Sequence, residues 1–329
     1  MIARVDLAAI NQLRDALPQF AHPPLCHLHH LNPDQHRAQW LNEISKSLAD
    51  ESSIAFASIV SGNVNGLLIY NDSPWDSQIT GRRIGNIKHL AVNTDDHAAT
   101  GILQDLIDEL TRTLGKRETQ CVACRVQSSE LAAIHALEQS GFLLMDTLLD
   151  LVFDFSRAPT EQTSPQRDKR LKTRRAEPAD MPALMAISER AFAGYFGRYH
   201  ADSRIPRSTA ARIYSEWLRS AFAGWADWIL VAEFDNKIAG HSVWRKILER
   251  QDANSRGVAS CDLLVIDPEF QGRRLGTALV RDGMQISRDF AQYLVTPLHV
   301  CNYSVQRTFQ NLGWRISGAR HSFHKWLKP

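Results

Sequence analysis

The sequence contains no apolar run that approaches the ~20 residues required to cross a bilayer. Its first residues, Met1 to Asp6, lack the apolar core of a signal peptide. Cysteine is scarce and odd in number, with five in 329 residues: Cys26, Cys121, Cys124, Cys261 and Cys301. A chain of this length does not need disulfides, so this cysteine usage fits a reducing compartment. We therefore expect a soluble protein of the cytoplasm.

An excess of charge of one sign is also missing, since 38 basic and 36 acidic side chains leave a net charge of +2. The basic run 167–175 has no interleaved aromatic residues and is typical of a solvated linker. We therefore expect no nucleic-acid partner and no insertion into a membrane. The shares of apolar (44%) and charged (22%) residues are those of a globular protein, and 329 residues are enough for two domains.

Two groups of residues contain side chains that bind metals, but neither has the pattern of a metal site. Cys121 and Cys124 have the spacing of a redox or zinc motif, yet they lie in a strand-like run, where residues three apart face opposite ways. The second group lacks paired spacing and follows two prolines; it consists of Cys26, His27, His29, His30 and His36. We predict that no metal is bound.

Residues 156–172 are polar, contain prolines and have few apolar side chains, which is typical of a linker. We predict a first domain over residues 1–157, a linker over 158–172 and a second domain over 173–329. The two halves share one order of elements. In the first half this order is strands 54–60, 65–70 and 84–92, a helix over 100–114, a strand over 121–126, a helix from Ser129 and a strand over 148–155. In the second half it is strands 229–234, 237–244 and 260–266, a helix over 274–290, a strand near 298–301, a short helix from Asn302 and a strand over 322–327. The sequence therefore predicts an α/β fold of two tandem copies, each a mixed (α+β) sheet flanked by helices.

The second half carries the most informative segment, residues 263–279. An apolar strand ends at Ile266 and runs into the loop Asp267-Pro-Glu-Phe-Gln-Gly-Arg-Arg-Leu-Gly276, which opens a helix. Main-chain N–H groups at such a helix N-terminus form an anion site. The alternative is an ordinary strand-to-helix turn.

The first copy differs at this point. Its loop, residues 93–102, has lost the amide or basic residue and both glycine positions of the second copy, and it contains Asp95 and Asp96. These carboxylates would repel a bound anion. We infer that the first half no longer binds a cofactor and serves as a scaffold or as one wall of an acceptor site.

The loop resembles the Gln/Arg-x-x-Gly-x-Gly/Ala signature of the GNAT acyltransferase superfamily. Gln271 and Gly276 match that signature, and Arg274 stands where its first glycine usually is. The segment that contains Phe196, Tyr214 and Trp217 resembles a helix of the dTDP-fucosamine type of amino-sugar N-acetyltransferase. Two further segments resemble the same type: Ala136-Leu-Glu-Gln-Ser-Gly-Phe142 and the Trp-containing strand at Trp326.

This resemblance implies direct acetyl transfer from acetyl-CoA, as co-substrate, to an amine. It implies that the strand residues Leu264, Val265 and Ile266 pair with the pantetheine. The pyrophosphate would lie on the loop residues Gln271, Gly272, Arg273, Arg274, Leu275, Gly276 and Thr277. Asn302 and Phe309 match positions next to the pantetheine or acetyl group. For the two arginines a solvated helix start stays open as the alternative, and for Asn302 a plain N-cap.

The catalytic groups follow less directly. The family's thiolate-protonating tyrosine corresponds to Phe309, which has no proton to give. Tyr303, Tyr293 and His299 lie nearby in the sequence, and a buried structural role is favoured for each of them. Tyr303 could replace that acid only if its helix begins elsewhere than at Asn302. Asp262 stands in an apolar strand and is either the base for the amine or a carboxylate that orders an arginine or the acceptor. A period of two would place residues 262, 264 and 266 on one face.

The sequence thus predicts an acetyl-CoA-dependent N-acetyltransferase whose acceptor is a primary amine, with a nucleotide-linked amino sugar as the leading candidate. Another small amine or a protein N-terminus is the alternative acceptor. A non-catalytic acyl-CoA-binding module, favoured by Phe309, is the alternative function. A homodimer is left open.

Overall fold

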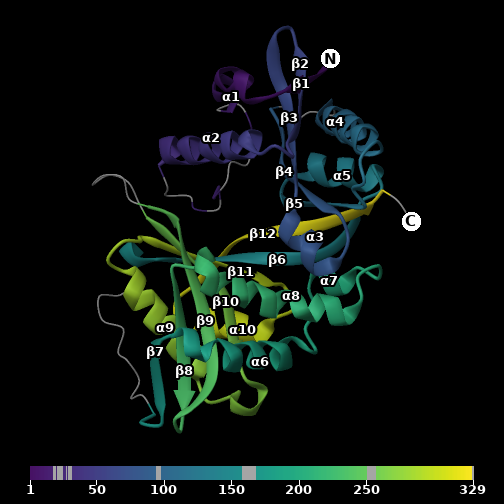
Figure 1. Ribbon diagram of the computed structural model, residues 1–329. Coiled ribbons are helices and arrows are strands. Elements are labelled where there is room, and N and C mark those ends of the chain that lie inside the picture. The colour runs from purple at the N-terminus through teal and green to yellow at the C-terminus, as the bar shows by residue number, and fades with distance from the viewer. Residues whose placement is uncertain are drawn as a thin grey trace. The chain divides into compact units, whose positions relative to one another are not determined.

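The computed structural model describes residues 1–17, 20, 25–26, 28, 32–93, 98–157, 168–249 and 257–327. It divides into an N-terminal unit, Met1–Thr147 with Gly318–Pro329, and a C-terminal unit, Leu148–Ser317. Both units are mixed α/β structures, as the sequence predicts (Figure 1). Within these described residues, no helix combines the length and the apolar character needed to span a membrane.

The N-terminal unit is built on the strand order β1-β2-β3-β4-β5-β12, and within the described residues β4–β5 is its only parallel pair. Helices α4 and α5 bury the apolar cluster on one face, and α1 and α2 bury a second cluster. Its elements are β1 Ile2–Val5, α1 Ile10–Ala16, α2 Pro33–Ala49, β2 Ile54–Val60, β3 Asn63–Asp72, α3 Pro74–Thr80, β4 Ile84–Val92, α4 Ala98–Leu114, β5 Cys121–Gln127, α5 Leu131–Gln139 and, from the other end of the chain, β12 Arg315–Trp326.

The C-terminal unit repeats this plan with the order β6-β11-β10-β9-β8-β7, and β10–β11 is its parallel pair. Helix α9 covers one face of the sheet, whereas α6 and α8 cover the other. Its elements are β6 Leu143–Asp154, β7 Leu171–Arg175, α6 Met181–Phe192, α7 Arg198–Ala201, α8 Arg207–Ser220, β8 Trp228–Phe234, β9 Lys237–Leu248, β10 Val258–Ile266, α9 Leu275–Ser287, β11 Tyr293–His299 and α10 Tyr303–Gln310.

The last strand of each unit comes from the other half of the chain. Strand β6 pairs antiparallel with β11, and β12, yellow in Figure 1, pairs antiparallel with β5. The strand predicted over residues 148–155 is present as β6, but it pairs in the sheet of the C-terminal unit. The compact units differ from the two consecutive halves by one exchanged strand each.

Helix α9 lies close to the sheet because Gly283 leaves room for the indole of Trp244 on β9. A Cβ atom at Gly283 would lie 2.0 Å from Cζ2 of Trp244, so no other residue fits there without movement. Trp244 is fully buried in the cluster under α9, as core packing predicts. This contact sets the height of α9, and so of the loop that precedes it, above β9 and β10.

Candidate active site

Strands β10 and β11 form a fork. Their parallel ladder pairs Val258 with Tyr293 and ends at the pair Ser260–Val295, although β10 continues to Ile266. Beyond this point β10 pairs only with β9. The Thr296 hydroxyl donates to the Cys261 carbonyl over 2.8 Å, at the branch point. The fork therefore leaves the edge of β10 that faces β11 open to another extended chain.

A β-bulge at Asp262 changes which side chains share a face. Cys261 pairs with Trp244 and Leu263 with Val243, so Asp262 is the extra residue of β10. After the bulge, Leu264 and Ile266 pack with the cluster under α9, whereas Leu263 and Val265 pack with the cluster under α6 and α8. The prediction that residues 262, 264 and 266 share a face is wrong, because one inserted residue reverses the alternation.

The loop after β10 presents main-chain N–H groups at the start of α9. A short 3₁₀ turn, Pro268–Phe270, leads to Gly272, and the helix opens with the hydrogen bond from the Ala278 N–H to the Arg274 carbonyl (3.1 Å). The amides of Leu275, Gly276 and Thr277 therefore have no acceptor within the helix. Together with the helix dipole, they make an anion site.

Arg274 takes a backbone conformation that normally belongs to glycine. Its φ is +61° and its ψ 17°, and it caps α9 without a side-chain hydrogen bond. This left-handed geometry explains why the motif has glycine at the position. Arg273, the residue before, places its guanidinium over the rings of Phe234 (4.8 Å) and Phe270 (5.2 Å).

Gly276 is not required by the packing of the described residues. A Cβ atom there would make only ordinary contacts of 3.7–3.8 Å, with Leu264, Ile266 and Thr308, and no positive φ is recorded for it. A glycine that the protein's own packing does not demand fits a helix start that a ligand approaches closely. The loop, the fork and Gly276 thus fit a phosphate-bearing chain laid along β10.

The three residues expected on α10 differ in their surroundings. Asn302 caps the helix, and its Oδ1 accepts the Val305 N–H over 3.4 Å. Tyr303 is the first helical residue and is 65% exposed, so the helix begins where the sequence predicts and the condition for Tyr303 to act as an acid is not met. Phe309 is 1% exposed and packs edge-on against Trp314, with ring centroids 4.8 Å apart.

Asp262 is held by two neighbours. The Arg245 guanidinium on β9 donates to both carboxylate oxygens (2.6 and 3.2 Å), and the Ser260 hydroxyl donates to Oδ1 over 2.8 Å. Arg245 in turn lies 4.2 Å from the ring centre of Trp225, at the end of α8. This arrangement matches the alternative in which the carboxylate orders an arginine.

An aromatic face covers this side of the sheet and was only partly foreseen. Tyr214 on α8 stacks on Phe192 (4.0 Å between centroids), and Tyr195 meets both rings edge-on. Phe196 is 52% exposed, and its ring lies 6.0 Å from His299 at the end of β11. Of these residues, the sequence singled out Phe196, Tyr214 and His299; Tyr195 had no motif to mark it.

His241 on β9 is completely buried on the α6 side of the sheet. Its Nε2 lies 3.4 Å from the Ser188 hydroxyl on α6, and Nδ1 has no recorded partner among the described residues. Burial lowers the pKa of His241 to about 3, so the imidazole is neutral at any physiological pH. It is a core residue rather than part of the exposed face.

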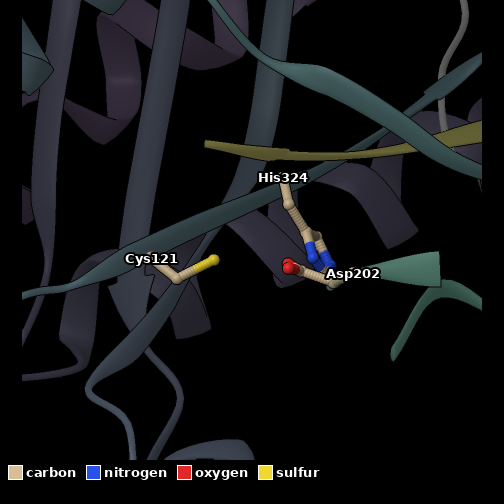
Figure 2. A group of neighbouring side chains, drawn as sticks. All are labelled: Cys121, Asp202 and His324. Carbon is tan, nitrogen blue, oxygen red and sulfur yellow. The ribbon is translucent and has the colours of Figure 1, made fainter. Parts of the chain in front are cut away.

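The cysteine pair of the first half lies on β5, and both cysteines are buried. Cys124 packs with the cluster under α4 and α5, whereas Cys121 shares the other face with His324 of the neighbouring β12, as Figure 2 shows. Asp202, also labelled there, belongs to the C-terminal unit, where its carboxylate accepts the Arg204 N–H over 3.0 Å. His27, His29 and His30, for which the sequence predicts no metal binding, lie outside the described residues, and so do residues 94–97 of the first copy's loop.

The family of the C-terminal unit follows from its sequence. Residues 183–314 match the model of the Acetyltransferase (GNAT) family. These residues form a GNAT acetyltransferase domain. A curated relative, the spore coat polysaccharide biosynthesis protein SpsD of Bacillus subtilis (strain 168), is 25% identical over 272 residues, which cover 80% of this chain and 84% of the relative.

Solved structures show that the fold of the whole chain is the tandem GNAT fold. A tandem GNAT protein from the clavulanic acid biosynthesis pathway aligns over 100% of this chain and 99% of its own, with a TM-score of 0.61 and 12% identity. A GCN5-related N-acetyltransferase from Sphaerobacter thermophilus aligns over 100% and 96%, with a TM-score of 0.61 and 12% identity. The predicted tandem arrangement is confirmed.

Proposed function

We propose that the C-terminal unit transfers an acetyl group from acetyl-CoA to a primary amine. The observation that carries this proposal is the open arm of β10, which runs directly into the amides at the start of α9. An extended pantetheine pairs with the main chain of Leu264–Ile266, and its pyrophosphate reaches the N–H groups of residues 271–277. Arg273 and Arg274 add positive charge beside these amides.

The acceptor we propose is an amino sugar linked to a nucleotide. The aromatic face formed by Tyr195, Phe196 and Tyr214 lies on the side of the sheet that carries Asp262, and amphipathic rings of this kind suit an acceptor with both apolar and polar edges. The relative SpsD, by its name, belongs to spore coat polysaccharide biosynthesis. The cytoplasm is the compartment in which we place the reaction.

The residues of the proposed site have different roles. The Asn302 side chain caps α10 through Oδ1, which leaves its amide N–H₂ to donate to the donor's pantetheine. Asp262, held by Arg245 and Ser260, orients the acceptor face rather than removing the amine's proton. The N-terminal unit serves as a scaffold. Phe309 fills the core, and this absence of a proton donor is the observation that favours the second candidate, a non-catalytic acyl-CoA-binding module.

Thiol release from acetyl-CoA, measured with a panel of dTDP- and UDP-linked amino sugars, tests the proposal. We expect turnover with at least one sugar and none with its hydroxyl analogue. Turnover only with other small amines or with peptide N-termini would replace the acceptor and keep the enzyme. Calorimetric binding of CoA without turnover on any amine would favour the binding module.

A further inference from the structure

The departing sulfur has no donor on α10 at the positions where the sequence suggested one. When an amine attacks a thioester, negative charge develops on the sulfur, and a hydrogen-bond donor placed there lowers the barrier. Phe309 has no polar atom and lies in the core, and the Tyr303 side chain is largely in solvent. The donor must therefore come from another element beside the fork.

The other arm of the fork ends in such a donor. Ser260 and Val295 form the last pair of the parallel ladder. His299 follows Val295 by four residues on β11, and Leu264 follows Ser260 by four residues on β10. Parallel strands rise by about 3.3 Å per residue and Asp262 is an extra residue of β10, so His299 lies level with Val265, next to Leu264, on the opposite arm. In the proposed complex the pantetheine pairs with Leu264–Ile266, and its thioester end lies at Leu264. The His299 ring is 5% exposed and lies between the edges of Phe196 (6.0 Å) and Tyr195 (6.3 Å), on the aromatic face.

The chain itself selects the tautomer of His299. The main-chain N–H of Cys301 donates to Nδ1 over 3.1 Å, and an N–H can donate only to a nitrogen that carries no proton. The single proton of the ring is then on Nε2. The ring therefore has its available N–H at Nε2, while Nδ1 is occupied as an acceptor.

We propose that His299 stabilises the departing sulfur by donating a hydrogen bond from its neutral Nε2–H, without giving up the proton. The amine nitrogen forms a bond to the thioester carbon, and the electrons of the carbon–sulfur bond go to the sulfur. The proton that the amine loses returns to the sulfur through solvent, so the products are the amide and the free thiol. This inference rests on the proposed acetyl transfer and names a residue that acts in it.

Substitution of His299 tests the proposal by separating chemistry from binding. His299→Leu removes the donor, and we expect kcat to fall by about 10²-fold while the Kd of CoA stays within about threefold. His299→Gln keeps an N–H near the place of Nε2, and we expect it to restore most of kcat. His135→Leu, an exposed histidine on α5, is the matched control and should have no effect. An unchanged kcat in His299→Leu would overturn the proposal.

The pH dependence distinguishes a neutral donor from an acid. The ratio of kcat for the wild type to that for His299→Gln cancels the titration of the acceptor amine. We expect this ratio to be constant from about pH 7 to about pH 9, because each side chain donates a hydrogen bond and does not transfer its proton. A ratio that falls as the pH rises would show an imidazolium acid and overturn the neutral-donor role.

A readout that does not depend on activity uses nitrogen NMR of the histidines in the full chain, with His299→Gln to assign the signal. We expect an unprotonated Nδ1 at neutral pH and a shift of the Nε2–H resonance when CoA is added. An unmoved resonance at saturating CoA would overturn the proposal. A wild type without turnover on any amine would overturn the proposed function together with it, whereas wild-type turnover with an unaffected His299→Leu would overturn this inference alone.

Discussion

Asp262 is a carboxylate in an apolar strand, and its position is tolerated because two neighbours satisfy it. Arg245 engages both oxygens and Ser260 engages one, while the Arg245 guanidinium rests on Trp225. A buried carboxylate without such partners would be strongly unfavourable. The local chemistry thus links the bulge of β10 to the end of α8, the helix that carries the aromatic face.

This ion pair predicts a measurable coupling. We expect Asp262→Asn and Arg245→Met each to lower the free energy of unfolding by roughly 1–3 kcal/mol, because each leaves a partner unsatisfied. The double variant should lose less than the sum, with a coupling of roughly 1–2 kcal/mol in a urea-unfolding cycle. In the transfer assay, the two single variants should lose similar kcat/KM. A far larger loss in Asp262→Asn alone would return the role of base to Asp262.

Arg274 offers a second test at the scale of one residue. A left-handed backbone costs a non-glycine residue roughly 1–2 kcal/mol, so we expect Arg274→Gly to stabilise the protein by about 1 kcal/mol. If the arginine is kept for phosphate binding, the same change should raise the Kd of CoA by about tenfold, a loss of about 1.4 kcal/mol.

The matched control is Ser61→Gly, at the turn between β2 and β3 of the N-terminal unit, where φ is +50°. It should give a similar gain in stability with no change in the Kd of CoA. An unchanged Kd in Arg274→Gly, measured by calorimetry, would show that the Arg274 side chain points to solvent.

At the scale of elements, the sequence predicts most strands and helices of the C-terminal unit but not the detail that orients the site. Apolar runs and turn residues place β10 and the loop before α9 within a few residues. The bulge at Asp262 has no such signal, because an inserted residue leaves the residue types unchanged while it reverses every later side chain. The faces of Leu264 and Ile266 were therefore mispredicted, whereas the main-chain edge that they offer was not affected.

Strand β9 contains the buried His241, which should make the protein less stable at acidic pH. The pKa of His241 is about 3 in the folded protein and about 6.5 when unfolded, so the unfolded chain takes up a proton that the folded chain does not. The free energy of unfolding should therefore fall as the pH falls from about 6.5 towards 3, by at most about 1.4 kcal/mol per pH unit.

The repeat supplies the variant that tests this. Leu67 of β3 occupies the position of His241, since Gly66 pairs with Val92 as Gly240 pairs with Ile266. We measure the free energy of unfolding in urea between about pH 7 and about pH 4.5, and we expect it to depend less on pH in His241→Leu than in the wild type. His89, whose pKa is lowered to about 4 by burial, remains in both proteins and cancels in the difference. Equal slopes for the two proteins would contradict the assignment.

For the whole molecule, the structure aligns the two copies residue by residue. In the N-terminal unit, β4 and β5 pair over four residues from Ile84–Cys121, and β4 has a bulge at Lys88. In the C-terminal unit, β10 and β11 pair over three residues from Val258–Tyr293, and β10 has a bulge at Asp262. The repeat was predictable because element order survives in the sequence. The exchange of β6 and β12 between the two sheets was not predictable from the sequence. The two copies offer each of these strands an equivalent partner, β5 or β11, and the local residue pattern does not distinguish between them.

This exchange predicts how the chain behaves when it is cut. A protease site inserted between Thr163 and Ser164 yields one fragment that carries β6 and another that carries β12. Because β6 completes the C-terminal sheet and β12 the N-terminal sheet, we expect the cleaved protein to elute as one species on size exclusion and to retain CoA binding. The fragments should part only in denaturant.

The control is a variant cleaved at the same site in which Leu149 and Leu151 of β6 are both replaced by Asp, since Leu151 is fully buried in the C-terminal core and Leu149 packs against it. These charges should detach β6 from β11, because a carboxylate without a partner cannot be buried in that cluster at an acceptable cost. Only the pairing of β12 with β5 then joins the fragments, so they should part at a lower denaturant concentration. Separation of the unsubstituted fragments into two folded species would show that each half closes its own sheet with its own last strand. Their continued association would show that the two copies cannot be parted without unpairing the exchanged strand of each, β6 from β11 and β12 from β5, which makes the N-terminal half of the chain a structural requirement of the C-terminal sheet.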